Sequence, residues 1–128
     1  MIPIGHTGEY KTIVTADLTV DFLGREDARV LGTPFLILLL ERTARNSIKP
    51  LLPPGEDSVG TVVNIRHLAA TPPGARVVFR TRVTAVDGRR VSFHVEAHDG
   101  GEKLAEGTHE RFVVDVERFA RALRKKER

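Results

Sequence analysis

Cysteine is absent from this sequence of 128 residues, which excludes a disulfide framework and thiolate chemistry. The expected compartment is therefore the cytoplasm. The first ten residues have neither the basic start nor the apolar core of a signal peptide. Glutamine is also absent, methionine occurs once, and asparagine is confined to Asn46 and Asn64. Depletion of labile residues beside 29% charged residues suggests a heat-adapted source, although genome composition produces the same bias.

Apolar runs long enough to cross a bilayer are absent too, because a span needs about 20 residues and the longest run covers only 34–40. No repeat, low-complexity stretch or linker divides the chain, and 41% hydrophobic residues are ordinary for a globular protein. We therefore expect a single domain over residues 1–128, with residues 1–8 and 120–128 flexible or peripheral. No membrane partner is expected.

The charge balance is weakly basic, with a net charge of +3 and a pI near 9.7. Much of the excess lies in residues 118–128, where a solvated terminal helix is the favoured interpretation. Nucleic-acid binding is disfavoured, because this tail lacks the series of aromatic residues that serve as stacking platforms. The positive bias also suits an anionic small molecule such as a nucleotide-bearing cofactor.

The histidines and acidic residues lack the spacing of metal ligands, so the sequence predicts no metal site. His94 and His98 share a strand face, but a rise of ~3.3 Å per residue places them about 13 Å apart, and both are expected to face solvent. His109 is expected to be a structural hydrogen-bond partner, without a chemical role.

The segment Gly32–Leu52 contains the longest apolar run, followed at once by Glu41. Pro34 fits the first turn of a helix, where its missing N–H costs nothing, and the Thr33 hydroxyl is expected to cap the free amides. A helix that is apolar all round must be wrapped by other structure. The sequence therefore predicts one buried helix, ended by the prolines at 50, 53 and 54.

Period-two alternation predicts strands on both sides of this helix. The expected strands are Glu9–Phe22 before it and Ser58–Leu68, Arg76–Val86, Val91–Ala97 and Lys103–Val114 after it. Short connections favour an antiparallel meander of the last four strands, followed by a terminal helix over Val116–Lys126 that Asp115 caps. The predicted fold class is α+β: a single curved antiparallel sheet of about five strands wrapped around a long central helix, with a short C-terminal helix.

Three polar residues near the buried helix have both a structural and a chemical interpretation. Glu41 either pairs with Arg45 one turn later or is desolvated in the apolar helix, which makes it a better base. A hydroxyl at Thr33 caps the helix and also lies beside amides that hold an oxyanion. His67 falls on a strand face with Val63, opposite Gly60, and is either a core residue or a catalyst.

Several motifs then coincide at coherent spacings. They are Gly32-Thr33-Pro34, Glu41, Gly60, His67–Gly74, Val86-Asp87-Gly88, Phe93, Ala97-His98-Asp99 and Gly107–Phe112. Together they resemble the fluoroacetyl-CoA thioesterase-like branch of the hotdog fold, over roughly residues 30–119. The resemblance implies a hotdog fold and hydrolysis of an acyl-CoA thioester at a site between two protomers, hence a homodimer or a tetramer. It implies no cofactor beyond the coenzyme A of the substrate.

The resemblance also assigns residues: catalytic Thr33, Glu41 and His67, a backbone position beside the acyl group at Gly60, and an arginine near the acyl pocket at Arg111. Glu41 would activate water or attack directly to give an anhydride. His67 would orient Glu41 or water and protonate the departing thiolate, and Thr33 would hydrogen-bond to Glu41 or the substrate. Where the named member of the branch has phenylalanines just ahead of the helix, this chain has polar residues 25–29, so fluoroacetyl specificity is not implied.

Two other functions remain compatible with the expected fold. One is a non-catalytic acyl-CoA or ligand-binding hotdog module, and the other is a hotdog dehydratase acting on hydroxyacyl or enoyl groups. The acyl group, and the choice between coenzyme A and a carrier protein, are not fixed by the sequence. Candidates for contact with the CoA phosphates are Arg66, Arg80, Arg82, Arg89 and Arg90.

Overall fold

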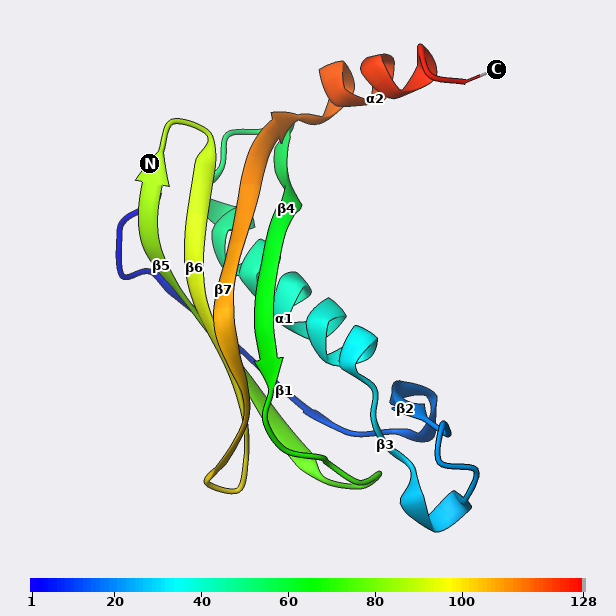
Figure 1. The fold of residues 1–128 in the computed structure, drawn as a ribbon. Helices are drawn as coiled ribbons and strands as arrows, with labels where there is room; N and C mark the ends of the chain where they lie inside the picture. Colours follow the sequence, from blue (N-terminus) through cyan, green and yellow to red (C-terminus); the bar gives the residue numbers. More distant parts are fainter. Residues whose placement is uncertain (128) are drawn as a thin grey trace.

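A five-stranded antiparallel sheet curves around one long helix in the computed structural model, which describes residues 1–127 (Figure 1). The strands are β1 (Thr7–Ile13), β4 (Glu56–His67), β5 (Arg76–Asp87), β6 (Arg90–Asp99) and β7 (Glu102–Asp115), and their order in the sheet is β1-β5-β6-β7-β4. The helix against the concave face is α1 (Thr33–Ile48). This arrangement confirms the predicted α+β class.

Consecutive hairpins join β5, β6 and β7, as the turn residues predict. Gly88, Gly100 and Gly101 have positive φ values of 59°, 56° and 113°, which glycine tolerates in tight turns. The expected meander of four strands was wrong in one respect, because β4 pairs with β7 and not with β5. The connection over residues 68–75 is too long for a tight hairpin, and it spans the ends of the two strands that lie between β4 and β5.

The expected single strand Glu9–Phe22 is interrupted. Strand β1 ends at Ile13, and a 3₁₀ helix over Ala16–Leu18 turns the chain away from the sheet. Short strands β2 (Thr19–Val20) and β3 (Val30–Leu31) then pair with each other just ahead of α1. The Thr15 hydroxyl donates to Asp17 at this turn, so local side-chain bonding competes here with the strand pattern. Between β2 and β3, Glu26–Ala28 forms a further 3₁₀ turn.

Helix α1 is buried along one side and partly open on the other. The buried residues are Leu36, Leu39, Leu40, Thr43, Ala44 and Ile48. On the opposite side Leu38 keeps 46% of its surface exposed. The prediction of a helix wrapped all round was therefore wrong for the single chain, because the sheet covers one side of it. A 3₁₀ turn, Lys49–Leu51, ends the helix near the expected prolines.

The core lies between α1 and the inner sheet face. Alternation predicts the inner residues of β6 correctly, and those of β5 as far as Val83. A bulge between Val83 and Ala85 then shifts the β5 register and leaves Ala85 exposed. Beyond the sheet, α2 (Val116–Arg124) begins as predicted at Asp115, which accepts a hydrogen bond from the Arg118 N–H at 3.0 Å (Figure 1). None of the helices in residues 1–127 combines the length and apolarity needed to span a bilayer.

Candidate active site

The five predicted site residues lie along the seam between α1 and the sheet, in two separate groups. Thr33 at the start of α1 meets His67 at the end of β4; we call these two the helix-start pair. Glu41 in the middle of α1 meets Gly60 of β4 and Arg111 of β7; we call these three the mid-helix cluster. Strand β4 therefore runs along α1 in the opposite direction, with the helix-start pair at one end of the shared seam and the mid-helix cluster near its middle.

The helix-start pair is a direct hydrogen bond, with Thr33 Oγ1 2.8 Å from His67 Nδ1. Gly32 is the N-cap residue and no side chain caps the helix, so the prediction that Thr33 is the cap was wrong. Its hydroxyl hydrogen-bonds to His67 instead. Because burial lowers the pKa of His67, the imidazole is neutral at neutral pH.

The other imidazole nitrogen is unused. His67 Nε2 is buried and has no hydrogen-bond partner among the described residues. An open cavity of about 380 Å³ lies beside the pair. It is lined mainly by apolar side chains: Val20, Phe22, Val30, Leu31, Thr33, Pro34, His67, Leu68, Ala69 and Ala70. A buried polar atom next to an apolar cavity is the usual arrangement of a small-molecule site.

The mid-helix cluster is built around a buried arginine. Arg111 is only 5% exposed, and its Nη1 donates to Glu41 Oε2 at 3.0 Å. Its Nε and Nη2 donate to the hydroxyl and the backbone carbonyl of Ser58, at 2.7 and 2.8 Å. Burial lowers the pKa of Arg111, and the Glu41 carboxylate opposes that shift. The fork of hydrogen bonds fixes the guanidinium, which in turn fixes one carboxylate oxygen of Glu41.

His109 completes the cluster from the same strand as Arg111. It is 2% exposed, and its Nε2 lies 3.2 Å from Arg111 Nη1. Because a guanidinium only donates, Nε2 must accept, which assigns the ring hydrogen to Nδ1 and its bond at 2.7 Å to the carbonyl of Val62. Burial lowers the pKa of His109, consistent with this neutral form. The histidine therefore links Arg111 to the backbone of β4.

Gly60 is required by the close approach of Glu41. A Cβ atom at this position would overlap Glu41 Oε2 and would also crowd the ring of His109. A bulge follows directly, because Gly60 pairs with Arg111 and Val62 with Glu110, leaving Thr61 as an extra residue. The bulge turns both Gly60 and His67 toward the helix. Simple alternation had placed them on opposite faces, and that prediction was wrong.

The two groups lie too far apart to touch within one chain. Eight residues separate Thr33 from Glu41, which at 1.5 Å per residue is about 12 Å along the helix. The expected contacts of Glu41 with Thr33 and with His67 are therefore absent from the single chain. Glu41 is also not desolvated as expected, since its side chain is 34% exposed and paired with Arg111.

Two polar residues of the cluster were not assigned to the site from the sequence. Ser58 was placed only in a strand, and His109 was given a structural bond without a partner. The signal was available in β7, where His109 and Arg111 alternate with the buried Val113 on one face. Buried polar side chains are nearly always hydrogen-bonded, so two of them on one buried strand face indicate a polar site in the core.

Other predicted interactions differ in detail. Arg45 pairs with Asp57, with Nε 3.0 Å from Oδ1, and not with Glu41. His94 and His98 point away from the core as expected, but they are only partly exposed, and their Nε2 atoms lie 3.0 and 2.9 Å from the two oxygens of Glu96. These contacts, first from His98 and then from His94, lower the pKa of Glu96 to about 2.

Comparison with known proteins agrees with this architecture. The family model of the fluoroacetyl-CoA-specific thioesterase matches residues 14–117. A fluoroacetyl-CoA thioesterase from Streptantibioticus cattleyicolor is 42% identical over 101 residues, which cover 79% of this chain and 73% of that protein. The chain therefore belongs to the fluoroacetyl-CoA-specific thioesterase family.

Solved structures support the same assignment. The fluoroacetyl-CoA thioesterase FlK superposes with a TM-score of 0.90 at 35% identity, covering 100% of this chain and 99% of that one. A thioesterase superfamily member from Thermus thermophilus gives 0.87 at 31% identity, covering 98% and 93%. A hot-dog-like protein from Thermanaerovibrio acidaminovorans gives 0.88 at 25%, covering 97% and 92%. The predicted hotdog fold and the predicted class of enzyme, a thioester hydrolase, are confirmed.

Proposed function

We propose that this protein hydrolyses an acyl-CoA thioester to the free acid and coenzyme A. The site is formed by the helix-start pair of one protomer and the mid-helix cluster of a second. The observation that carries this proposal is the division of the five site residues into two groups about 12 Å apart on one helix. Neither group alone provides both a base and a neutral imidazole beside the cavity, whereas the two together do.

A two-fold axis brings the two groups together. If two copies of α1 pack antiparallel about an axis midway between residues 33 and 41, each Thr33 faces the partner's Glu41. The corresponding midpoint of Gly60 and His67 falls at residues 63–64 of β4. In a two-fold interface the same patch serves both partners, so one axis satisfies both conditions.

The surface near this axis is suited to burial. Leu38 is 46% exposed, and Val62 and Val63 are each 42% exposed. Strand β4 is also an edge of the sheet, with backbone groups available to a further strand. Exposed apolar residues beside a free edge favour pairing with a second copy. We therefore propose a homodimer, and light scattering distinguishes it from a tetramer.

The chemistry follows from the positions of the unpaired groups. Amides in the first turn of α1 have no helical acceptor and polarise the thioester carbonyl. Glu41 has one oxygen held by Arg111, and its other oxygen takes a proton from the attacking water. With Thr33 donating to His67 Nδ1, the ring carries its hydrogen on Nε2, and this N–H donates a hydrogen bond that stabilises the departing thiolate. The proton that Glu41 took from water then passes to the thiolate, so coenzyme A leaves as the thiol and the Glu41 base is regenerated.

No cofactor enters this reaction, because coenzyme A is part of the substrate. Direct attack of Glu41 would instead give an anhydride, which transfers one oxygen from the enzyme to the acid when water opens it at the Glu41 carbonyl. A single turnover in H₂¹⁸O tests this route, because label recovered in Glu41 requires the anhydride. Label in the product acid alone fits both the general-base route and an anhydride that water opens at the acyl carbon.

Thiol release from a panel of short, long and aromatic acyl-CoAs tests the proposed activity. We expect turnover by the wild type and its loss in Glu41→Gln, with the preferred acyl group identified by kcat/KM. Arg42→Gln provides a matched control, since this neighbouring side chain on α1 is exposed. Binding of acyl-CoA without thiol release from any member of the panel would instead indicate a non-catalytic binding module.

A further inference from the structure

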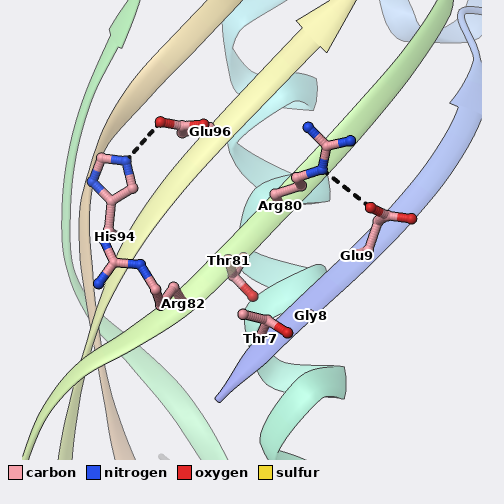
Figure 2. Close-up of a pocket in the computed structure, with 8 residues that line it drawn as sticks. All are labelled: Thr7, Gly8, Glu9, Arg80, Thr81, Arg82, His94 and Glu96. Carbon is pink, nitrogen blue, oxygen red and sulfur yellow. Dashed lines mark hydrogen bonds and ion pairs between the residues drawn. The ribbon is translucent and has the colours of Figure 1, made fainter. Parts of the chain in front are cut away.

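The outer face of the sheet, opposite α1, carries a second cluster of chemically competent side chains. On β6 the inward residues Phe93, Val95 and Ala97 are buried, so His94, Glu96 and His98 point outward. Strand β7 adds Glu106, which pairs directly with Glu96. Figure 2 shows His94 and Glu96 from one side, at the edge of an open pocket of about 360 Å³.

The potential ligand atoms of three residues converge. One nitrogen of His94 and one oxygen each of Glu96 and Glu106 all lie within 4.8 Å of one another. One of these pairs, His94 Nε2 and Glu96 Oε1, is 3.0 Å apart. Donors bound at 2.0–2.2 Å to a tetrahedral ion lie roughly 3.3–3.6 Å from each other. Small side-chain rotations are enough to reach that spacing, and the sheet holds the backbone positions fixed.

The arrangement also has an electrostatic requirement. Two carboxylates directly opposite each other on neighbouring strands repel. Lys103 relieves this repulsion, with its Nζ 2.9 Å from Glu106 and 3.6 Å from Glu96. The lysine side chain is 39% exposed, so it is free to move into solvent when another cation takes its place. The cluster is therefore a cation site that a flexible side chain fills.

We propose that His94, Glu96 and Glu106 bind one divalent transition-metal ion of the Zn²⁺ type, with water completing the coordination. One imidazole and two carboxylates suit such an ion better than Mg²⁺ or Ca²⁺, which prefer oxygen alone. His98 then acts outside the coordination sphere, with its Nε2 2.9 Å from the second oxygen of Glu96. Such a contact orients a ligating carboxylate.

The neighbouring strand limits the affinity. Arg80 and Arg82 of β5 line the same pocket, and Arg80 is drawn toward Glu9 at 3.1 Å (Figure 2). Their positive charge disfavours a cation, whereas Glu9 offsets part of it. The site lies on the face of the sheet opposite the cavity at His67, so it does not depend on the proposed reaction.

Calorimetric titration of the chelator-treated full-length protein with Zn²⁺ tests this site. We expect one ion per chain, and at least tenfold weaker binding in His94→Asn and in Glu106→Gln. Lys103→Met removes the competing cation and should tighten binding. Two control variants should leave the affinity unchanged. Glu102→Gln removes a carboxylate on the same strand as Glu106 but outside the cluster, and His67→Asn removes a histidine on the other face of the sheet.

Titration with Co²⁺ adds a readout of the ligand set, since its visible absorption reports coordination geometry. A tetrahedral spectrum in the wild type that His94→Asn removes would support the assignment. Wild-type protein that takes up no Zn²⁺ would overturn it, as would equal affinity in wild type, His94→Asn and Glu106→Gln. Circular dichroism verifies that each variant is folded. If a ligand variant does not fold, the affinity of Lys103→Met still tests the site, and an unchanged affinity there would count against it.

Discussion

The helix-start pair and the mid-helix cluster share one helix but differ in how far their hydrogen bonds are satisfied. In the cluster, Arg111 is 5% exposed and all three of its nitrogens have partners. In the pair, Thr33 and His67 bond to each other, and His67 Nε2 has no hydrogen-bond partner within residues 1–127. The mid-helix cluster therefore holds the Glu41 carboxylate in a fixed position. The helix-start pair leaves one imidazole nitrogen free beside an apolar cavity. In the proposed dimer, the mid-helix cluster would supply the fixed carboxylate and the helix-start pair of the other protomer would supply the imidazole with a free nitrogen.

Substitutions that break either half should have the largest effect on turnover. Glu41→Gln and His67→Asn are each expected to lower kcat by about 10²–10⁴-fold, the usual contribution of a positioned acid or base. The melting temperature should change little in His67→Asn and fall in Glu41→Gln, because the second variant leaves the buried guanidinium of Arg111 without its carboxylate partner. The initial rate of thiol release at a saturating concentration of acyl-CoA measures kcat. Near wild-type kcat in both variants would contradict the proposed roles.

Removing one hydrogen-bonding group from each half sharpens the comparison. Arg111→Met leaves Ser58 and His109 without their buried partner, so we expect a loss of about 3 kcal/mol in the free energy of unfolding, together with a loss of activity. Thr33→Val removes a hydroxyl at an exposed position and should cost less than about 1 kcal/mol while activity falls. Urea denaturation measures both. Equal destabilisation would show that the two halves are alike.

Two glycine-to-alanine substitutions compare a methyl group that would clash with a side chain and one that would clash with the backbone. In Gly60→Ala the new methyl group meets Glu41, whose side chain is able to move, so we expect kcat to fall by about 10–100-fold with modest destabilisation. In Gly107→Ala the methyl group meets the backbone of Asn64, so β4 and β7 must separate. This variant should lose roughly 1–3 kcal/mol of stability. Both kcat and the free energy of unfolding are measured for both variants. A larger loss of stability in Gly60→Ala than in Gly107→Ala would contradict the geometry.

The smallest expected effect is on pH dependence. Burial lowers the pKa of His67 below its ordinary 6.5. The neutral ring is thus favoured in the folded state: its stabilisation is complete above pH 6.5 and is lost as the pH falls through the lower folded value. The acid limb of kcat/KM should lie below pH 6.5. Proton NMR of the His67 ring measures the same pKa, and titration at or above 6.5 would contradict the burial argument.

Local patterns in the sequence predicted the parts of the fold that depend on local physics. The turns at Gly88 and Gly100 and the inner face of β6 follow from backbone preference and alternation. The bulge at Thr61 does not, because it is tied to the bond that the His109 ring makes to Val62 from another strand. Its effect is large, since it decides that Gly60 and His67 share a face.

The sequence predicted five residues that lie along the seam between α1 and the sheet, but it predicted neither Ser58 nor His109 there, nor how the residues pair. Motif resemblance proposed Thr33, Glu41 and His67 as catalytic, whereas the polar contact of Glu41 is with Arg111, 70 residues later in the chain. Such a contact depends on β7 presenting Arg111 on the sheet face that α1 covers, beside its partner strand β4, which no local pattern specifies. The separation of Glu41 from Thr33, by contrast, follows from helical rise alone and was available from the sequence.

Complementation between two inactive variants tests the shared site most directly. Glu41→Gln and His67→Asn are unfolded together, refolded as a one-to-one mixture, and assayed for thiol release against each variant alone. With a site drawn from two protomers, each mixed dimer has one intact site, so activity should return to about a quarter of the wild-type value. Activity no higher than that of the separate variants, in a mixture shown to contain mixed dimers, would contradict the shared site.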